Sequence, residues 1–274
     1  MKSIAIPKYI SGYLQNNIHD QATFDMIKNL YQRNLVKGNR PEITISIPAY
    51  NEEDNIIPTL LSLCSNITSW SVEIVVTNNN SKDNTANLVT ACGIKCILET
   101  KQGIAHARNA GLAEAKGKYI LNADADTVYP KNWIDEMVKP LEKYPDVAIS
   151  YGIFSLIPIG STGRFVYYFY EMFAELTRFY NKYKKSEAVN VYGFNSAFRK
   201  EQGLQVNGFD HPSVTGTVED GYLALKLTQK GFGKMYRVNT AIVWTTDRRI
   251  QIDGGLYKAT VKRLKRLFNI NQPK

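Results

Sequence analysis

Short segments rich in β-branched residues alternate with longer amphipathic segments through the first half of the chain. Continuous or alternating apolar residues predict strands, and apolar residues at steps of three and four predict helices. By these patterns we expect strands at residues 43–47, 72–76, 95–98 and 118–123, and helices at residues 55–67, 84–92, 104–115 and 130–144. This alternation predicts an α/β fold with a single doubly wound, mostly parallel sheet and flanking helices.

The rest of the sequence is less regular and divides the chain into three parts. We expect an N-terminal helical extension at residues 1–40, a main domain at residues 41–250 and a basic amphipathic helix at residues 251–274. In the extension, the helix is expected from Gln21 to Leu35, before the polar segment Lys37–Pro41. Later in the main domain, we expect strands at residues 147–154 and 193–198 and a helix at residues 221–230.

Aromatic residues crowd the segment from Phe165 to Tyr183, which contains nine Phe and Tyr residues. We expect these side chains to pack in the core, because large aromatic residues usually bury much of their surface. An acceptor-binding groove and a membrane-facing element are the two alternatives for this segment.

Composition narrows the possible partners and location. The hydrophobic fraction of 44% suits a globular protein, and a net charge of +9 favours anionic partners such as nucleotides, lipid surfaces or nucleic acid. No stretch of about 18 apolar residues predicts a transmembrane helix, and the sequence after Lys2 does not resemble a secretory signal. Cys64, Cys92 and Cys96 lack a second pair of zinc ligands nearby, so we expect free thiols in a reducing cytoplasm.

The C-terminal segment combines an apolar stripe with a basic face. The stripe comprises Tyr257, Val261, Leu264 and Phe268, and the basic residues Lys258, Lys262, Lys265 and Arg266 lie largely away from it. Such a helix can lie on an anionic membrane, here the inner face of the plasma membrane, or it can dock on the main domain.

Asp124 and Asp126 directly follow a predicted strand. Side chains two positions apart in a strand point the same way, so the two carboxylates would repel each other without a cation between them. Mg²⁺ prefers one or two carboxylates together with substrate oxygens, although a solvated turn would also explain these residues. The loops Pro48–Glu52 and Asn78–Asn80 also follow strands, so we expect all three loops to converge at one edge of the sheet.

These motifs, taken in order, resemble the family-2 glycosyltransferases with the GT-A fold. The resemblance covers roughly residues 42–250. It rests on Pro48–Glu52, Asn78–Thr85, Gly103–Gly111, Asp124–Asp126, and Gly208–Asp210 followed by Glu219-Asp220. It implies an inverting transfer of a sugar from a nucleotide-diphosphate donor to an acceptor hydroxyl.

The resemblance also implies roles for individual residues. The nucleotide sugar, expected to be a UDP-sugar, would be bound by Pro48, Ala49, Tyr50, Glu52, Asn79, Lys101, Gly103, Arg108, Asp124 and Ala125. Asp126 and Asp124 would hold Mg²⁺ or Mn²⁺, with Asp247 as a candidate third ligand. Asn79 stands where many relatives place an Asp that faces the base, which leaves the identity of the base open.

Asp220 is the expected general base, with Glu219 orienting it or binding the acceptor. The acceptor would be a saccharide or a lipid-linked saccharide. The other interpretation of Glu219 and Asp220 is an acidic first helical turn, which the helix dipole favours.

Two other functions are compatible with parts of this pattern. A sugar nucleotidyltransferase would need a Gly-rich basic loop after its first strand, and Pro48–Glu52 contains neither Gly nor Lys or Arg. A nucleic-acid-binding protein would need a recognisable motif or a basic face, whereas the basic excess here is largely terminal. We therefore expect an enzyme that does not bind nucleic acid.

Overall fold

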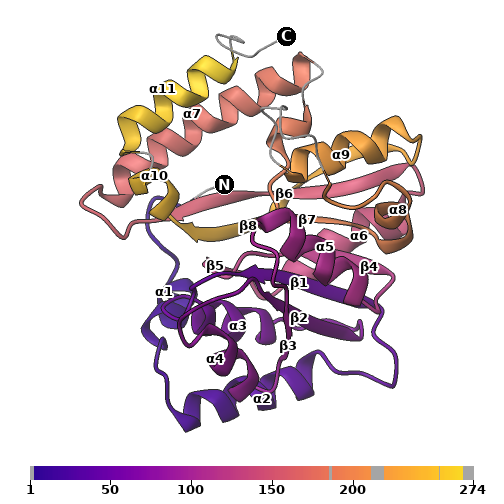
Figure 1. The fold of residues 1–274 in the computed structure, drawn as a ribbon. Helices are drawn as coiled ribbons and strands as arrows, with labels where there is room; N and C mark the ends of the chain where they lie inside the picture. The colour runs from indigo at the N-terminus through magenta and orange to yellow at the C-terminus, as the bar shows by residue number, and fades with distance from the viewer. Residues whose placement is uncertain (1–2, 185–186, 211–218, 253, 268–274) are drawn as a thin grey trace.

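The computed structural model describes residues 3–184, 187–210, 219–252 and 254–267. Its centre is one eight-stranded sheet with the strand order β3-β2-β1-β4-β7-β6-β8-β5 (Figure 1). The strands are β1 (Ile43–Ala49), β2 (Val72–Asn78), β3 (Lys95–Leu98), β4 (Tyr119–Asn122), β5 (Thr127–Val128), β6 (Val147–Ile157), β7 (Ser196–Arg199) and β8 (Lys234–Thr246).

The sheet is mostly parallel, as the sequence predicts. Strand β1 pairs in parallel with both β2 and β4, β2 pairs in parallel with β3, and β6 pairs in parallel with β8. Strand β7 runs antiparallel to β4 and β6, and β5 runs antiparallel to β8. The carboxyl ends of β1, β2 and β4 therefore share one edge of the sheet.

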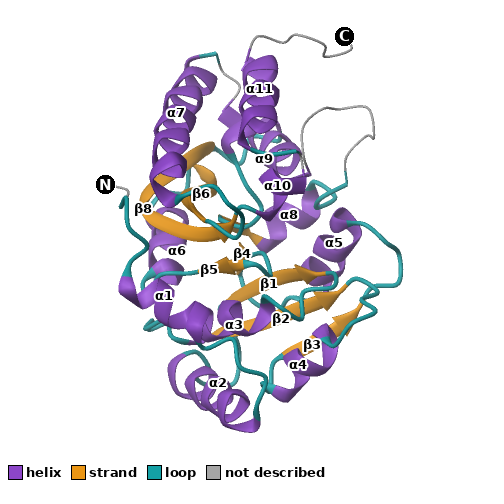
Figure 2. Cartoon of the chain, turned by 90° about the vertical axis from the view of Figure 1, so that its left-hand side faces the viewer, coloured by secondary structure: helices purple, strands orange, loops and turns teal. Residues whose placement is uncertain are grey.

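Helices cover both faces of the sheet. They are α1 (Lys8–Gln15), α2 (Gln21–Asn34), α3 (Ile56–Cys64), α4 (Thr85–Ala91), α5 (Ile104–Glu114), α6 (Trp133–Lys143), α7 (Arg164–Tyr183), α8 (Lys200–Gln205), α9 (Glu219–Gln229), α10 (Arg248–Ile252), α11 (Leu256–Leu267) and the 3₁₀ turn η1 (Glu187–Asn190). Figure 2 shows α3 and α4 on one side of β1–β3 and α5 on the other. The eight elements predicted in the first half are present, with no end shifted by more than three residues.

Burial explains the positions of these elements. Ile43, Ile45 and Ile47 of β1 are fully buried in one core cluster, while Ile120 and Phe198 belong to a second. Close packing at the start of β4 requires Gly117, because a Cβ there would lie 2.5 Å from the backbone of Ile43. In the N-terminal part, Ile10 of α1 and Ile27 of α2 are buried against α3, so both helices extend the same core.

One expectation was wrong. The aromatic segment predicted to pack in the core is helix α7, and many of its large apolar side chains lie on the surface. Phe165, Phe169 and Phe179 are 60%, 56% and 74% exposed. Core packing fails here because the buried face of α7 is largely polar and includes Glu171 and Arg178.

The remaining expectations concern cysteines and membranes. Cys64, Cys92 and Cys96 are free thiols, as predicted. In the described ranges, no helix is both long enough and apolar enough to cross a bilayer. Helix α11 lies within the segment expected to form the C-terminal helix and packs beside α7, while Phe268 of the predicted stripe lies outside the described residues.

Candidate active site

The loops after β1, β2 and β4 meet at the carboxyl edge of the sheet, as predicted. The first two loops are joined directly: the Glu52 N–H donates to Thr85 Oγ1 at 2.8 Å, and the Lys82 N–H donates to Asn51 Oδ1 at 2.8 Å. The sharp turns in these loops fall on Asn51 and Asn80, whose φ angles are 53° and 63°. Asn tolerates this left-handed conformation better than most residues, which explains its use at both positions.

Asp126 lies beside Glu52 and a cation. Arg248 Nη2 lies 3.0 Å from Asp126 Oδ2 and 2.5 Å from Glu52 Oε1, and Arg248 Nη1 donates to Glu52 Oε2 at 3.0 Å. Thr246 Oγ1 also donates to Asp126 Oδ2, at 3.2 Å. Burial raises the pKa of Asp126 to about 6, the nearby Asp124 charge adds to this, and Arg248 opposes it.

Arg108 connects Asp124 with the second acidic pair. Its guanidinium is only 1% exposed and donates from Nη2 to Asp124 Oδ1 at 2.8 Å. On its other side, Nε lies 3.3 Å from Asp220 Oδ1 and 3.9 Å from Glu219 Oε1. The charges of Asp220, Asp124 and Glu219 raise the pKa of Arg108 despite its burial, so it remains a cation. This one side chain links the two carboxylate pairs that the sequence singled out.

Asp220 is buried at the start of α9 and faces Arg108 across Gly193. A Cβ at Gly193 would lie 2.4 Å from both carboxylate oxygens of Asp220 and 2.1 Å from Arg108 Nη2, so only glycine fits this position. Burial raises the pKa of Asp220 and Arg108 opposes this effect, while the charges of Glu219 and Asp124 raise it further. A carboxylate with a raised pKa is suited to accept a proton near neutral pH.

Asn79 organises the loop before α5. Its side-chain NH₂ donates to the carbonyls of Glu99 and Lys101 at 3.0 and 2.8 Å, and its Oδ1 accepts from the Gly103 N–H at 2.8 Å. The Asn79 amide therefore positions the Lys101–Gly103 loop, and its contact with a nucleotide base stays a prediction. The Lys101 side chain is exposed at this edge.

The remaining predicted donor-site residues lie at the same edge of the sheet. Ala49 and Ala125 are buried, and the Ala49 carbonyl accepts from the Asn79 N–H at 2.8 Å. Pro48 is partly buried at the end of β1, whereas Tyr50 is 49% exposed and presents an aromatic ring. The Tyr50 ring is therefore accessible, and its contact with a nucleotide stays a prediction.

Asp247, the candidate third metal ligand, has other partners. One of its oxygens accepts from the Ile159 N–H at 3.0 Å, and the other accepts from the Tyr167 hydroxyl at 2.5 Å and from Gln251 Nε2 at 2.9 Å. It is fully buried in this network. In the part of the chain that the structure describes, no cluster of three or more His, Cys, Asp or Glu side chains could hold a metal ion. A metal at Asp124 and Asp126 would complete its coordination with substrate or solvent oxygens.

Sequence reasoning singled out Arg108 but missed two other partners of the acidic residues. Arg248 follows β8, far from Glu52 and Asp126 in the sequence, and β8 itself was not predicted. Tyr129 was missed as well; it accepts from the Asp124 N–H and donates to the Phe194 carbonyl, both at 3.0 Å. The available signal was charge, because buried carboxylates at a strand end require a nearby cation.

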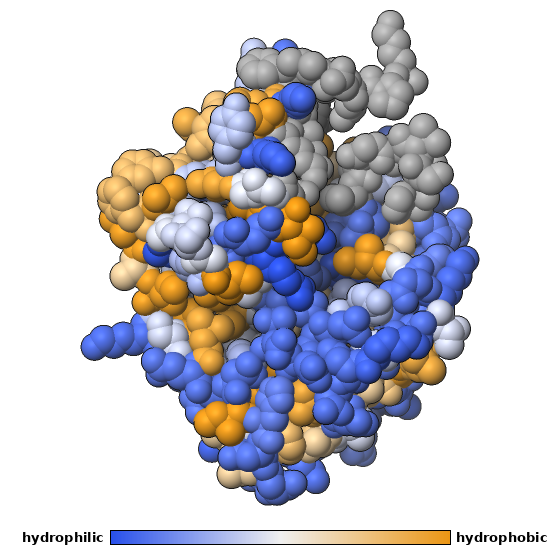
Figure 3. Space-filling model, turned by 60° about the vertical axis from the view of Figure 1, so that its left-hand side comes forward, coloured by the Kyte–Doolittle hydropathy of each residue, from blue (hydrophilic) through white to orange (hydrophobic). Residues whose placement is uncertain are grey.

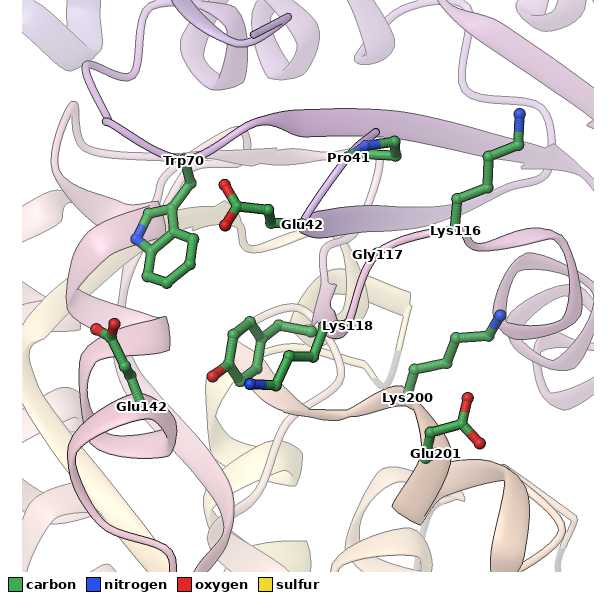
Figure 4. Close-up of a pocket in the computed structure, with 10 residues that line it drawn as sticks. Pro41, Glu42, Trp70, Lys116, Gly117, Lys118, Glu142, Lys200 and Glu201 are labelled. Carbon is green, nitrogen blue, oxygen red and sulfur yellow. The ribbon is translucent and has the colours of Figure 1, made fainter. Parts of the chain in front are cut away.

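A separate pocket of about 630 Å³ lies at the amino ends of β1 and β4. Figure 4 shows Trp70 and Glu42 on one side of it and Lys200 and Glu201 on another. Ligands of doubly wound sheets bind at the carboxyl ends of strands, so this pocket is on the wrong edge to be the donor site. The predicted site residues instead gather around Asp124, Asp126 and Asp220.

Comparison with known proteins agrees with this arrangement. An undecaprenyl-phosphate 4-deoxy-4-formamido-L-arabinose transferase from Serratia proteamaculans is 31% identical over 117 residues, which are 39% of this chain and 35% of that protein. This chain thus matches about a third of that relative's length.

Two solved structures show the same fold. The mannosyltransferase PcManGT from Pyrobaculum calidifontis, in complex with GDP-Man and Mn²⁺, has a TM-score of 0.59 and 21% identity, covering 94% of this chain and 76% of that one. Glucosyl-3-phosphoglycerate synthase from Mycobacterium tuberculosis, in complex with Mn²⁺ and UDP-Glc, has a TM-score of 0.56 and 18% identity, covering 90% and 84%. Both support the predicted GT-A fold.

The glycosyl transferase family 2 model matches residues 44–202, from β1 to the start of α8. This range is more than half of the chain and contains the three converging loops, Arg108 and the Asp124–Asp126 pair. The chain therefore belongs to glycosyl transferase family 2.

Proposed function

We propose that this protein transfers a sugar from a nucleotide-diphosphate donor to an acceptor hydroxyl with inversion at the anomeric carbon. The observation that carries this proposal is Arg108, which joins Asp124 to Asp220 and so places a donor-side carboxylate next to a candidate base. Reaction at an anomeric carbon needs these two functions close together, one at the departing diphosphate and one at the attacking hydroxyl.

The acidic residues fit a divalent metal. Asp126 and Asp124 supply hard oxygen ligands, and the raised pKa of Asp126 together with its Arg248 partner indicates a position that requires positive charge. Mg²⁺ or Mn²⁺ would be held by these two carboxylates. When bound, it would act as a Lewis acid on the diphosphate.

Asp220 would act as the general base. Its carboxylate takes the proton of the acceptor hydroxyl as that oxygen forms a bond to the anomeric carbon. The bond between the anomeric carbon and the donor phosphate oxygen breaks, and the nucleoside diphosphate leaves with the bonding pair. Arg108 keeps Asp220 oriented and compensates its charge before proton transfer, while Glu219 lies on the acceptor side.

The donor and acceptor are proposed by class. The solved relatives bind GDP-Man and UDP-Glc, and we propose a UDP-sugar as the donor here. Pro48, Ala49, Tyr50, Glu52, Lys101, Gly103 and Ala125 would surround it. The name of the Serratia relative includes an undecaprenyl phosphate, and we propose a saccharide or lipid-linked saccharide as acceptor, with the protein at a membrane surface.

A thermal-shift panel tests the donor site. UDP, GDP, CDP and dTDP are each added with and without Mn²⁺ to the wild-type protein and to Asp126→Asn. A ligand at 100 times its Kd stabilises the folded state by about 2.7 kcal/mol, so one nucleotide should raise Tm clearly, and more with Mn²⁺. The variant should lose the Mn²⁺-dependent part. Equal shifts for all nucleotides, or an unchanged Mn²⁺ effect in the variant, would contradict the proposed site.

A further inference from the structure

Helix α7 turns its polar side inward and its apolar side outward. Its apolar ridge comprises residues between 46% and 78% exposed: Phe165, Val166, Phe169, Met172, Leu176, Phe179 and Tyr183. The spacing of three and four residues places most of these side chains on one face of the helix. Figure 3 shows orange, hydrophobic side chains gathered on the upper left of the molecule, over α7.

Buried contacts hold α7 in this orientation. Glu171 is fully buried and accepts from the Leu156 N–H at 2.7 Å and from Arg164 Nη2 at 3.0 Å. Arg178, on the same inner face, is 2% exposed and lies 4.9 Å from the centre of the Phe154 ring. A rotation that buried the apolar ridge would expose or orphan these charged groups, so the ridge is held on the surface.

Basic residues lie beside the ridge. Helix α11 packs next to α7, as Figures 1 and 2 both show, and its sequence contains five Lys or Arg residues and no Asp or Glu. Lys182 at the end of α7 is 64% exposed, and Lys258 of α11 is also exposed. An apolar ridge next to a basic helix complements an anionic lipid surface, where apolar groups enter the interface and cations meet headgroups.

We propose that α7 docks the protein on an anionic bilayer, with its apolar ridge in the interface and α11 contacting the headgroups. This assigns the apolar contact to α7 instead of the terminal helix. A second copy of the chain fits the ridge less well, because pairing two ridges would bring two basic α11 helices together. The docking surface also adjoins the site, since the Tyr167 hydroxyl on α7 donates to Asp247, the residue before Arg248.

Vesicle co-sedimentation tests the proposal without any substrate. The full chain is mixed at low salt with vesicles of phosphatidylcholine alone or with 30% phosphatidylglycerol. The test variant combines Phe169→Gln, Leu176→Gln and Phe179→Gln, and the control is Ile67→Gln, because Ile67 is 72% exposed outside the ridge. A second variant, Lys182→Glu with Lys258→Glu, tests the basic flank. Circular dichroism and Tm confirm that each variant folds.

The wild type and Ile67→Gln should bind anionic vesicles at least tenfold more tightly than neutral ones. Both test variants should lose at least tenfold in partition coefficient. Wild-type binding by the triple variant would overturn the proposal. Negligible vesicle binding by the wild type would overturn it as well. Light scattering would then detect whether the wild type dimerises through the ridge. The nucleotide-dependent Tm shift of the same proteins tests the proposed transferase function separately. The docking of α7 does not rest on that function, and only the idea of a lipid-linked acceptor does.

Discussion

Arg108 is the central residue of the site because three carboxylates share its one buried positive charge. Asp124, Asp220 and Glu219 lie 2.8, 3.3 and 3.9 Å from its guanidinium nitrogens. Breaking a buried ion network by removing one partner is strongly destabilising, since the remaining charges lose their compensation. The residue therefore matters for folding as well as for the proposed chemistry.

Replacing Arg108 by Met keeps much of the side-chain volume and removes the charge. We expect Arg108→Met to lower the free energy of unfolding by about 3–5 kcal/mol at neutral pH. Arg108→Lys, the matched control, should lose less stability because it keeps the positive charge. It should still lose some, since Lys cannot reach both acidic pairs with a planar fork. Urea unfolding measures both variants. A loss of less than about 1 kcal/mol in Arg108→Met would show that the network is not important for stability.

Asp220→Asn tests the proposed base. Asn keeps the shape of the side chain but cannot accept the proton, so turnover should fall by roughly 10²–10⁴-fold while donor affinity is retained. Because burial raises the pKa of Asp220, the wild-type rate should decline on acidification at a higher pH than an ordinary aspartate would give. Turnover within about threefold of wild type would transfer the role to Glu219.

The pKa of Asp126 predicts how stability depends on pH. Its folded-state pKa is about 6, above the usual value of 3.8, so the folded protein binds more protons between these values. The stabilisation that Asp126 contributes is therefore fully present below about pH 4 and is lost as the pH rises through about 6. A pKa difference of about two between the folded and unfolded states changes the free energy of unfolding by at most about 3 kcal/mol.

Asp126→Asn cannot ionise, so it should gain stability relative to the wild type as pH rises from 4 to 7. Thermal unfolding in EDTA measures the difference at each pH, with Asp146→Asn as an exposed control. A difference between variant and wild type that does not change with pH would mean that Asp126 ionises as an ordinary aspartate in the folded protein.

At the scale of elements, the sequence predicts the parallel half of the fold well because its strands are short apolar runs between clear helix patterns. The aromatic segment that forms α7 was wrongly expected to pack in the core, since apolar spacing does not reveal which side of a helix faces the core. The polar residues Glu171 and Arg178 decide that orientation through partners distant in the sequence. Asp124 and Asp126 were identifiable as two carboxylates after a predicted strand, and Asp220 only through the family resemblance. The pairing with Arg248 depends on the long strand β8, which was not predicted.

Asp247 joins elements of the fold through contacts away from the two carboxylates proposed to hold a metal. Its carboxylate accepts from Tyr167 on α7, Gln251 on α10 and the Ile159 N–H. Asp247→Ala should leave these groups unpaired at about 1–3 kcal/mol each, and Tm should fall clearly. Asp247→Asn, which can keep part of the network, should retain the full Mn²⁺-dependent nucleotide shift. Loss of that shift in a folded Asn variant would make Asp247 a metal ligand after all.

At the scale of the whole molecule, Arg248 brings together three segments that are far apart in the sequence. It pairs with Glu52 in the loop after β1 and with Asp126 after β4, and it begins α10, which leads to α11. A metal ion at the proposed site would compete with the Arg248 guanidinium for the Asp126 carboxylate. Metal binding at the proposed site would therefore displace or rearrange this ion pair, and it would couple that site to the C-terminal helices.

Arg248→Gln tests that competition. The ion pair is partly exposed, with 38% of the Arg248 side chain accessible, so its loss should cost only about 1 kcal/mol in the absence of ligand. Without the competing cation, the Mn²⁺ concentration at half-maximal stabilisation should fall about fivefold, measured by thermal shift with Mn²⁺ alone. Arg249→Gln, the neighbouring residue, is the control. A midpoint that rises in Arg248→Gln would mean that Arg248 assists metal binding, and the guanidinium would then be a component of the loaded site.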